Sequence, residues 1–166
     1  MRKVSEFNPL LIYPYYENIA QLIHHSNHFI QWGAIQILAN LTSIDINMKF
    51  DSIYHEYFDL IHSDSMITAA NVVGGSWKTI KARPELETDI TNRLLQVNNY
   101  TYLYKHQPSI ECKNILIGHV IDCFDQYYAI SKNKPLIVDF ERGHQLNERK
   151  STAKKASNFI NKHANK

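Results

Sequence analysis

Apolar residues recur along the chain at the spacing of amphipathic helices. Between Met48 and Ile61, the apolar positions fall three or four residues apart, which places them on one side of a helix. These positions are Phe50, Ile53, Tyr54, Tyr57, Phe58 and Ile61. Similar stripes occupy residues 30–41, 86–97 and 116–127, and no segment alternates with a period of two. The pattern therefore predicts helices and no strands.

Residues that favour helix starts divide this pattern into segments. Pro84 suits the first turn of a helix, and Pro14 is expected to kink the first helix or delay its start. The polar residues predicted to cap the following turns are Asn27, Asn47, Ser65, Ser109 and Asn147. The predicted helices cover residues 8–25, 28–42, 48–62, 66–82, 84–97, 109–130, 135–146 and 148–163.

The second members of successive helix pairs resemble one another. Small or β-branched residues stand at matching places, with separations of 36, 50 and 36 residues. These residues are Ala34, Ala70, Val120 and Ala156. The longer separation contains the polar, tyrosine-rich loop 98–108. Such a recurrence predicts an all-α fold, an α-α superhelix of about four helix pairs forming one domain over residues 1–166. A plain helical bundle is the alternative, since these positions suit any helix interface.

The composition is that of an ordinary globular protein. The 166 residues are 44% hydrophobic and 20% charged, which allows one well-formed core. No stretch approaches the roughly 18 to 20 unbroken apolar residues of a membrane-spanning helix, and charged residues and prolines interrupt the apolar N-terminal patch. Because no export signal is predicted and Cys112 and Cys123 are the two cysteines, we expect a cytoplasmic location with reduced thiols. Because no membrane-spanning segment is predicted, we expect no membrane partner.

The net charge of +2 is unevenly distributed. Residues 141–166 contain seven basic and two acidic residues, whereas the rest of the chain has more acidic than basic residues. We expect this basic end to be a solvated last helix, and a contact to nucleic acid or an acidic partner is the alternative.

Few residues suggest chemistry. His24, His25 and His28 have the spacing of metal ligands, but Ser26 and Asn27 between them indicate a turn, so we predict no metal site. Cys112 and Cys123 occupy core positions of a helical stripe. The Gly74–Gly75 pair lacks a phosphate-loop motif and is better explained by close approach of a neighbouring helix. We therefore predict no catalytic residue and no cofactor.

The loop at residues 98–108 concentrates aromatic residues. It contains Tyr100, Tyr102 and Tyr104, followed by Lys105 and His106. Amphipathic rings beside a cation are typical of a recognition surface. A loop that folds back and packs its own rings explains the same residues.

Several segments resemble the second helices of HEAT repeats. The run FIQWGAIQILANL from Phe29 to Leu41 carries the resemblance most clearly, and Asp64 fits the aspartate of the turn within a repeat. The usual arginine on the second helix is absent, except for Arg149. The other similar segments are residues 65–80, 112–127 and 150–162, the last two resembling the third and terminal repeats of small bacterial HEAT-like proteins.

This resemblance implies a non-catalytic scaffold that holds a protein partner on the concave surface formed by the second helices. Polar residues beside the apolar stripes would line that surface and suit a protein interface. The predicted partner-binding residues are Gln36, Asn40, Asn71, Lys78, Asp122, Lys154 and Lys155.

Two other functions remain open. Alkylpurine DNA glycosylases also have HEAT-like repeats, and Trp32, Trp77, Asp122 and Arg149 are the residue types that such enzymes use. The basic C-terminal helix would then contact nucleic acid, although a near-neutral chain is a poor duplex binder. HEAT-like lyases and their relatives instead regulate or mature another protein around a chromophore, for which no residue here selects.

Overall fold

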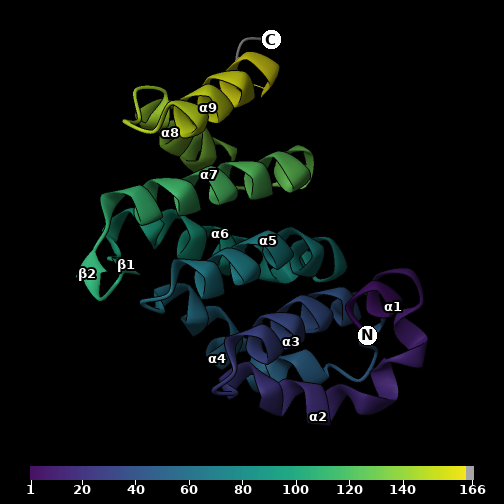
Figure 1. Ribbon diagram of the computed structural model, residues 1–166. Coiled ribbons are helices and arrows are strands. Elements are labelled where there is room, and N and C mark those ends of the chain that lie inside the picture. Colours follow the sequence, from purple (N-terminus) through teal and green to yellow (C-terminus); the bar gives the residue numbers. More distant parts are fainter. Residues whose placement is uncertain (164–166) are drawn as a thin grey trace.

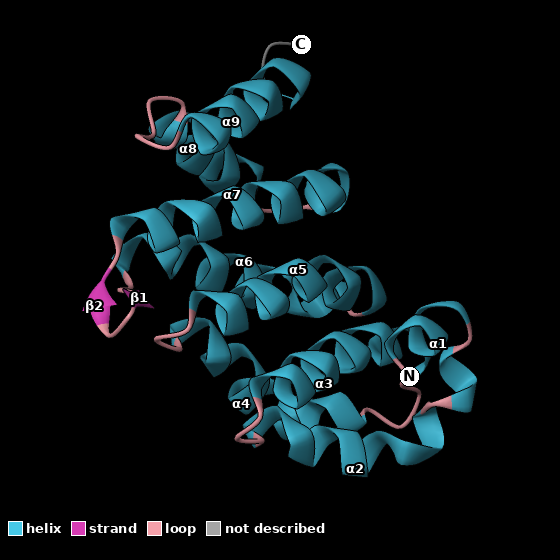
Figure 2. Cartoon of the chain, in the orientation of Figure 1, coloured by secondary structure: helices cyan, strands magenta, loops and turns pink. Residues whose placement is uncertain are grey.

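A computed structural model describes residues 1–163, most of which lie in helices. Helices are the predominant secondary structure of this part, so the predicted all-α class is confirmed (Figures 1 and 2). The last three residues of the predicted domain 1–166 lie outside the described range. The helices are α1 (Arg2–Phe7), α2 (Tyr16–Gln21), α3 (His28–Leu41), α4 (Tyr54–Asp59), α5 (Met66–Ala82), α6 (Glu87–Leu95), α7 (Ile110–Tyr127), α8 (Lys134–His144) and α9 (Lys150–His163). Within residues 1–163, none of them combines the length and hydropathy needed to cross a membrane.

Helix starts follow the predicted signals at most positions. The side chains of Asn27, Ser65 and Ser109 each accept a hydrogen bond from a backbone N–H of the next turn, at 3.0, 3.3 and 3.2 Å. The segment around Pro14 forms short 3-10 turns, and the α-helix proper begins at Tyr16, so the expected delay is confirmed.

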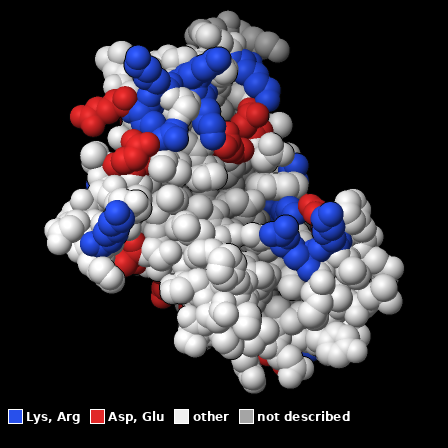
Figure 3. All heavy atoms as spheres, viewed as in Figure 1, with Lys and Arg blue, Asp and Glu red and all other residues white. Residues whose placement is uncertain are grey.

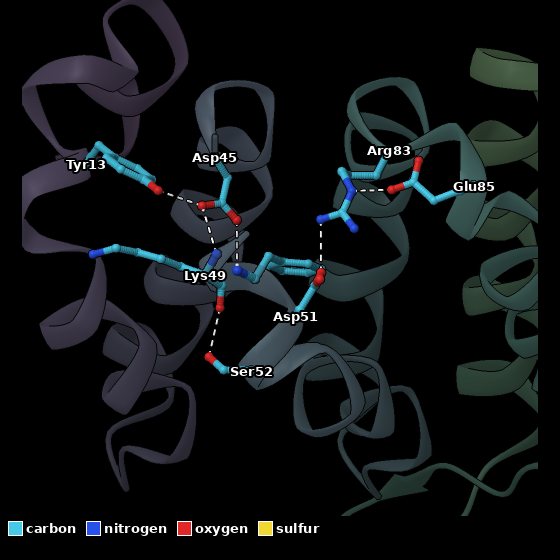
Figure 4. Close-up of polar contacts among 8 residues, drawn as sticks. Tyr13, Asp45, Lys49, Asp51, Ser52, Arg83 and Glu85 are labelled. Carbon is cyan, nitrogen blue, oxygen red and sulfur yellow. Dashed lines mark hydrogen bonds and ion pairs between the residues drawn. The ribbon is translucent and has the colours of Figure 1, made fainter. Parts of the chain in front are cut away.

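The prediction for Asn47 is wrong, because Asp45 caps the next segment. The Asp45 carboxylate accepts hydrogen bonds from the backbone N–H groups of Lys49 and Phe50 at 3.0 and 2.8 Å, and from the Tyr13 hydroxyl at 2.6 Å (Figure 4). Met48, which lies between Asp45 and Lys49 in the chain, has a left-handed backbone conformation with a φ of 53°. An acceptor two residues further upstream thus reaches the free amides across a tight bend.

Two short elements were not predicted. The prediction of no strands is wrong for a small antiparallel hairpin, β1 (Leu103–Tyr104) and β2 (Gln107–Pro108). Strands of two residues are too short to show alternation, and the turn residues Lys105 and His106 carry no glycine or asparagine signal despite their positive φ values. Helix α1 was missed because Ser5 is its one buried residue, which leaves no apolar stripe.

The longer helices stack in chain order. Helix α3 packs against α5, α5 against α7, and α7 against α9, and each is preceded by a shorter helix (Figure 1). Hydrogen bonds across the stack join residues about one helix pair apart: Trp32 to Thr68 over 36 positions, and Thr152 to the Asn114 carbonyl over 38. A continuous apolar core runs between the longer helices and the shorter helices that precede them.

Ion pairs link the shorter helices in the same way. Arg83, just after α5, donates to Asp51 at 2.9 Å and also pairs with Glu85 (Figure 4). Arg93 on α6 reaches back to Asp59 on α4 at 3.0 Å. Successive pairs are therefore connected on both sides of the core.

Candidate partner-binding site

A polar cleft of about 400 Å³ lies between α1, α3 and α5. Four of the seven predicted partner-binding residues line it, namely Gln36, Asn40, Asn71 and Lys78. Arg2 and Glu6 of α1 line it too. A second hollow of about 600 Å³ shares Glu6, Asn40 and Lys78 and adds Trp77 and Lys81.

Hydrogen bonds hold the amide side chains of the cleft in defined orientations. The Gln36 side-chain amide donates to Asn71 Oδ1, and the Asn71 side-chain amide donates to the Ile67 backbone carbonyl at 2.8 Å. The Asn40 amide donates to the Ser5 hydroxyl at 2.9 Å. Each amide keeps capacity for a further donor or acceptor contact, because a side-chain amide has two N–H groups and two lone pairs.

Lys78 lies deepest among the charged residues of the cleft. Its side chain is 27% exposed, and its ammonium group donates to Asn40 Oδ1 at 2.6 Å and lies 3.4 Å from Glu6 Oε1. Lys78 Nζ and Lys81 Nζ also lie 5.5 and 4.6 Å from the centroid of the Trp77 ring. Lys78 thus brings a positive charge into the cleft, and the Trp77 ring borders the adjoining hollow.

The two adjacent glycines of α5 have different roles. A Cβ at Gly75 would lie 2.7 Å from Ala39 Cβ and 3.2 Å from the Tyr57 hydroxyl, so glycine there permits the close contact of α3 and α5. The predicted close approach is confirmed at this position. At Gly74 a Cβ would meet no atom within 4 Å, because this residue faces the cleft. The missing side chain at Gly74 keeps the cleft open.

The other predicted partner-binding residues lie at the far end of the stack. Asp122 and Lys155 pair with each other beside a hollow of about 200 Å³, and Lys155 also donates to the Gly118 carbonyl at 3.2 Å. Lys154 is exposed on α9. On the face seen in Figure 3, Lys and Arg form two main clusters with a mostly uncharged surface between them. The seven residues therefore form two groups rather than one continuous site.

The three clustered histidines have separate surroundings. His24 pairs with Glu56 at 3.0 Å, His25 accepts a hydrogen bond from the Asn27 backbone at 2.9 Å, and the His28 ring lies against Trp32. Over residues 1–163, no three histidine, cysteine or acidic side chains are grouped closely enough to hold a metal ion.

Both cysteines are buried, as their helical positions predict. Burial raises the pKa of the Cys123 thiol to about 12. A thiol with such a pKa is protonated at neutral pH and is a poor nucleophile.

The tyrosine-rich loop folds back onto the core at two of its three rings. Tyr102 is fully buried and its hydroxyl donates to the Ile61 carbonyl at 3.0 Å, while the Tyr100 ring lies 4.2 Å from the His62 ring. Tyr104 is 61% exposed at the edge of an apolar hollow of about 810 Å³, between the hairpin and the starts of α5 and α7. No local sequence pattern indicates this hollow, because its walls come from three separate segments.

The four residue types shared with DNA glycosylases are held by different partners. Trp32 bonds to Thr68, Asp122 pairs with Lys155, and Arg149 donates to Glu111 at 2.8 Å. Trp77 packs beside Lys81 in the cleft region.

No protein-family model matches this chain, and neither a curated protein nor a solved structure matches it. The candidate site is therefore defined by its own geometry and charge.

Proposed function

We propose that the chain is a non-catalytic scaffold that binds a protein partner along the face formed by α3, α5, α7 and α9. We further propose that these helix pairs constitute a short HEAT-like superhelix. The hydrogen bonds that recur at a separation of one helix pair, together with the direct stacking of the longer helices, support this architecture.

The cleft between α1, α3 and α5 is the observation on which this function rests. Its amide side chains offer donors and acceptors together, which suits the alternating N–H and C=O groups of a peptide backbone. It is open and polar, unlike the enclosed and mainly apolar pockets that bind small molecules. Protein interfaces have this mixed polar character at their rims.

Nucleic-acid binding through α9 is the second candidate. Its basic side chains favour it, but two of them are already paired with acidic groups on α7: Lys155 with Asp122, and Lys162 with Asp125 at 2.8 Å. Such pairing lowers the positive charge available to phosphates.

We also propose that the chain is located in the cytoplasm, where its two free thiols would stay reduced.

A pull-down with a cleft-filling variant tests the scaffold function. Gly74→Gln places a long polar side chain in the cleft, and Gly143→Gln makes the same change at an exposed helical glycine of α8 with equally open space. We expect tagged wild type and Gly143→Gln to retain a stoichiometric protein after nuclease treatment, and Gly74→Gln to retain about tenfold less. Equal capture by both variants, or loss of the partner on nuclease treatment, would contradict the proposal.

A further inference from the structure

Helix α1 is held against the cleft by polar contacts. It has six residues, of which Ser5 is the buried one, and its Phe7 side chain is 82% exposed. Its contacts to the cleft are the Ser5 hydroxyl with Asn40 and the Glu6 carboxylate with Lys78. Because little apolar surface is buried beneath α1, displacing it costs far less than displacing a core helix.

Glu6 supplies the negative charge of a region that is otherwise basic. Of the described residues lining the two adjoining hollows, Arg2, Lys78 and Lys81 are basic and Glu6 is acidic. Figure 3 shows this cluster of basic groups beside the N-terminal helices. The Glu6 side chain is 53% exposed, so its pairing with the more buried Lys78 is solvent-accessible and exchangeable.

We propose that the cleft binds an acidic segment of the partner protein, one of whose carboxylates takes the place of Glu6 on Lys78. This inference rests on the proposed scaffold function and names the chemistry of the partner. In the free chain, Glu6 occupies the ligand's position on Lys78, and α1, which forms one wall of the cleft, is displaced when the ligand binds. On binding, the partner's carboxylate pairs with Lys78, and the amides of Gln36 and Asn71 contact its main chain.

The shape of the site favours a peptide over nucleic acid. A nucleic acid gains its affinity by neutralising many phosphates along an extended basic surface. Here three basic side chains gather around amide groups over two adjoining hollows, and a mostly uncharged surface separates them from the basic residues of α9. One or two carboxylates match this arrangement.

Binding of defined probes tests the proposal. The probes are a fluorescein-labelled octapeptide of alternating Glu and Ser, the same peptide with Gln in place of Glu, and a labelled single-stranded 12-nucleotide DNA. We expect the Glu peptide to bind best at low salt, as measured by fluorescence anisotropy. Trp77 fluorescence in a Trp32→Phe background reports the same event locally, because Trp77 lines the adjoining hollow.

Charge-neutralising variants should change affinity in opposite directions. Lys78→Gln is expected to weaken binding of the Glu peptide about tenfold, whereas Glu6→Gln should strengthen it about threefold by removing the internal competitor. Lys132→Gln removes an exposed lysine before α8 and should leave affinity unchanged. Circular dichroism melting confirms folding, and Lys81→Gln, at an exposed position, replaces Lys78→Gln if the latter unfolds.

Unchanged or weaker binding by Glu6→Gln, unchanged binding by a folded Lys78→Gln, or tighter binding of the DNA would overturn this inference. The scaffold function fails separately, when Gly74→Gln captures as much partner as Gly143→Gln. If Gly74→Gln loses the partner while Glu6→Gln and Lys78→Gln capture it as wild type does, the scaffold function stands and the acidic-segment inference fails.

Discussion

Neighbouring glycines on α5 illustrate how strongly a residue's role depends on the direction in which it points. Gly74 and Gly75 are indistinguishable in sequence, and both lower helix propensity by about 1 kcal/mol relative to alanine. Both line the cleft, but a Cβ at Gly74 would meet open space, whereas a Cβ at Gly75 would meet Ala39 on α3. Because neighbouring residues point in different directions around the helix axis, Gly74 tolerates a larger side chain, whereas Gly75 is required for the close contact with α3.

Alanine at these two positions should therefore have opposite effects. Gly74→Ala should raise the free energy of unfolding by about 0.5 to 1 kcal/mol, since the new methyl group meets no neighbour. Gly75→Ala should lower it by about 1 to 3 kcal/mol, because a Cβ 2.7 Å from Ala39 Cβ forces the helices apart. Urea denaturation measures both, and changes of equal sign would contradict the packing described here.

Glu141 on α8 is a buried acid that has no hydrogen-bond partner within residues 1–163. Its side chain is fully buried, and neither carboxylate oxygen has a partner among the described residues. Burial, with smaller contributions from Asp125 and Asp122, raises the pKa of its carboxyl group to about 8. The folded chain consequently carries this group protonated at neutral pH, whereas the unfolded chain ionises it.

Stability should depend on pH through this residue. The stabilisation associated with protonated Glu141 is complete below the unfolded pKa of about 4.5. Above that pH the free energy of unfolding falls by about 1.4 kcal/mol per pH unit, and the stabilisation is lost as the pH passes the folded pKa of about 8. Glu141→Gln removes the titration, so the free-energy difference between variant and wild type should shift in the variant's favour by a few kcal/mol from pH 5 to pH 8. Urea denaturation at pH 5, 6.5 and 8 checks this, and parallel pH curves would refute it.

At the scale of elements, helices were predicted well where a capping side chain marks the start. The segments that became α3, α5 and α7 follow the caps Asn27, Ser65 and Ser109 and contain several buried apolar residues, so local chemistry and burial agree. The hairpin and α1 were not predicted, because each is too short to show a sequence pattern and is held by contacts with other segments of the chain.

The loop before α7 offers a test of how an irregular element is anchored. Tyr102→Phe should lower the free energy of unfolding by about 1 kcal/mol by removing the hydrogen bond to Ile61, and Tyr102→Ala by about 3 to 5 kcal/mol by leaving a cavity. Tyr104→Ala, at an exposed ring, should change it by less than about 0.5 kcal/mol. Comparable losses at both tyrosines in urea denaturation would argue against the fold-back arrangement.

At the scale of the whole molecule, stability should vary along the stack. Helices α5 and α7 each have a long helix on both sides, whereas α9 has one such neighbour and α1 contributes one buried residue. In a stacked array each pair gains stability from its neighbours, so the ends open first.

Hydrogen exchange followed by mass spectrometry should reveal this gradient. Amides of α5 and α7 are expected to exchange slowest, those of α9 faster, and those of α1 fastest. An acidic peptide that displaces α1 should speed exchange there further while slowing it in α5 around Lys78. Uniform protection along residues 1–163 would instead indicate one cooperative bundle.

Periodicity and capping are local properties, so they were enough to predict the helical class, most helix starts and the polar character of Gln36, Asn40, Asn71 and Lys78. Which of these polar residues form a cleft depends instead on how the helices pack. Glu6 and Lys78 are 72 positions apart and meet because α1 folds back onto the stack, while Asp122 and Lys155 meet at its other end. Pairings of this kind depend on how helices are placed in space, which no local pattern encodes.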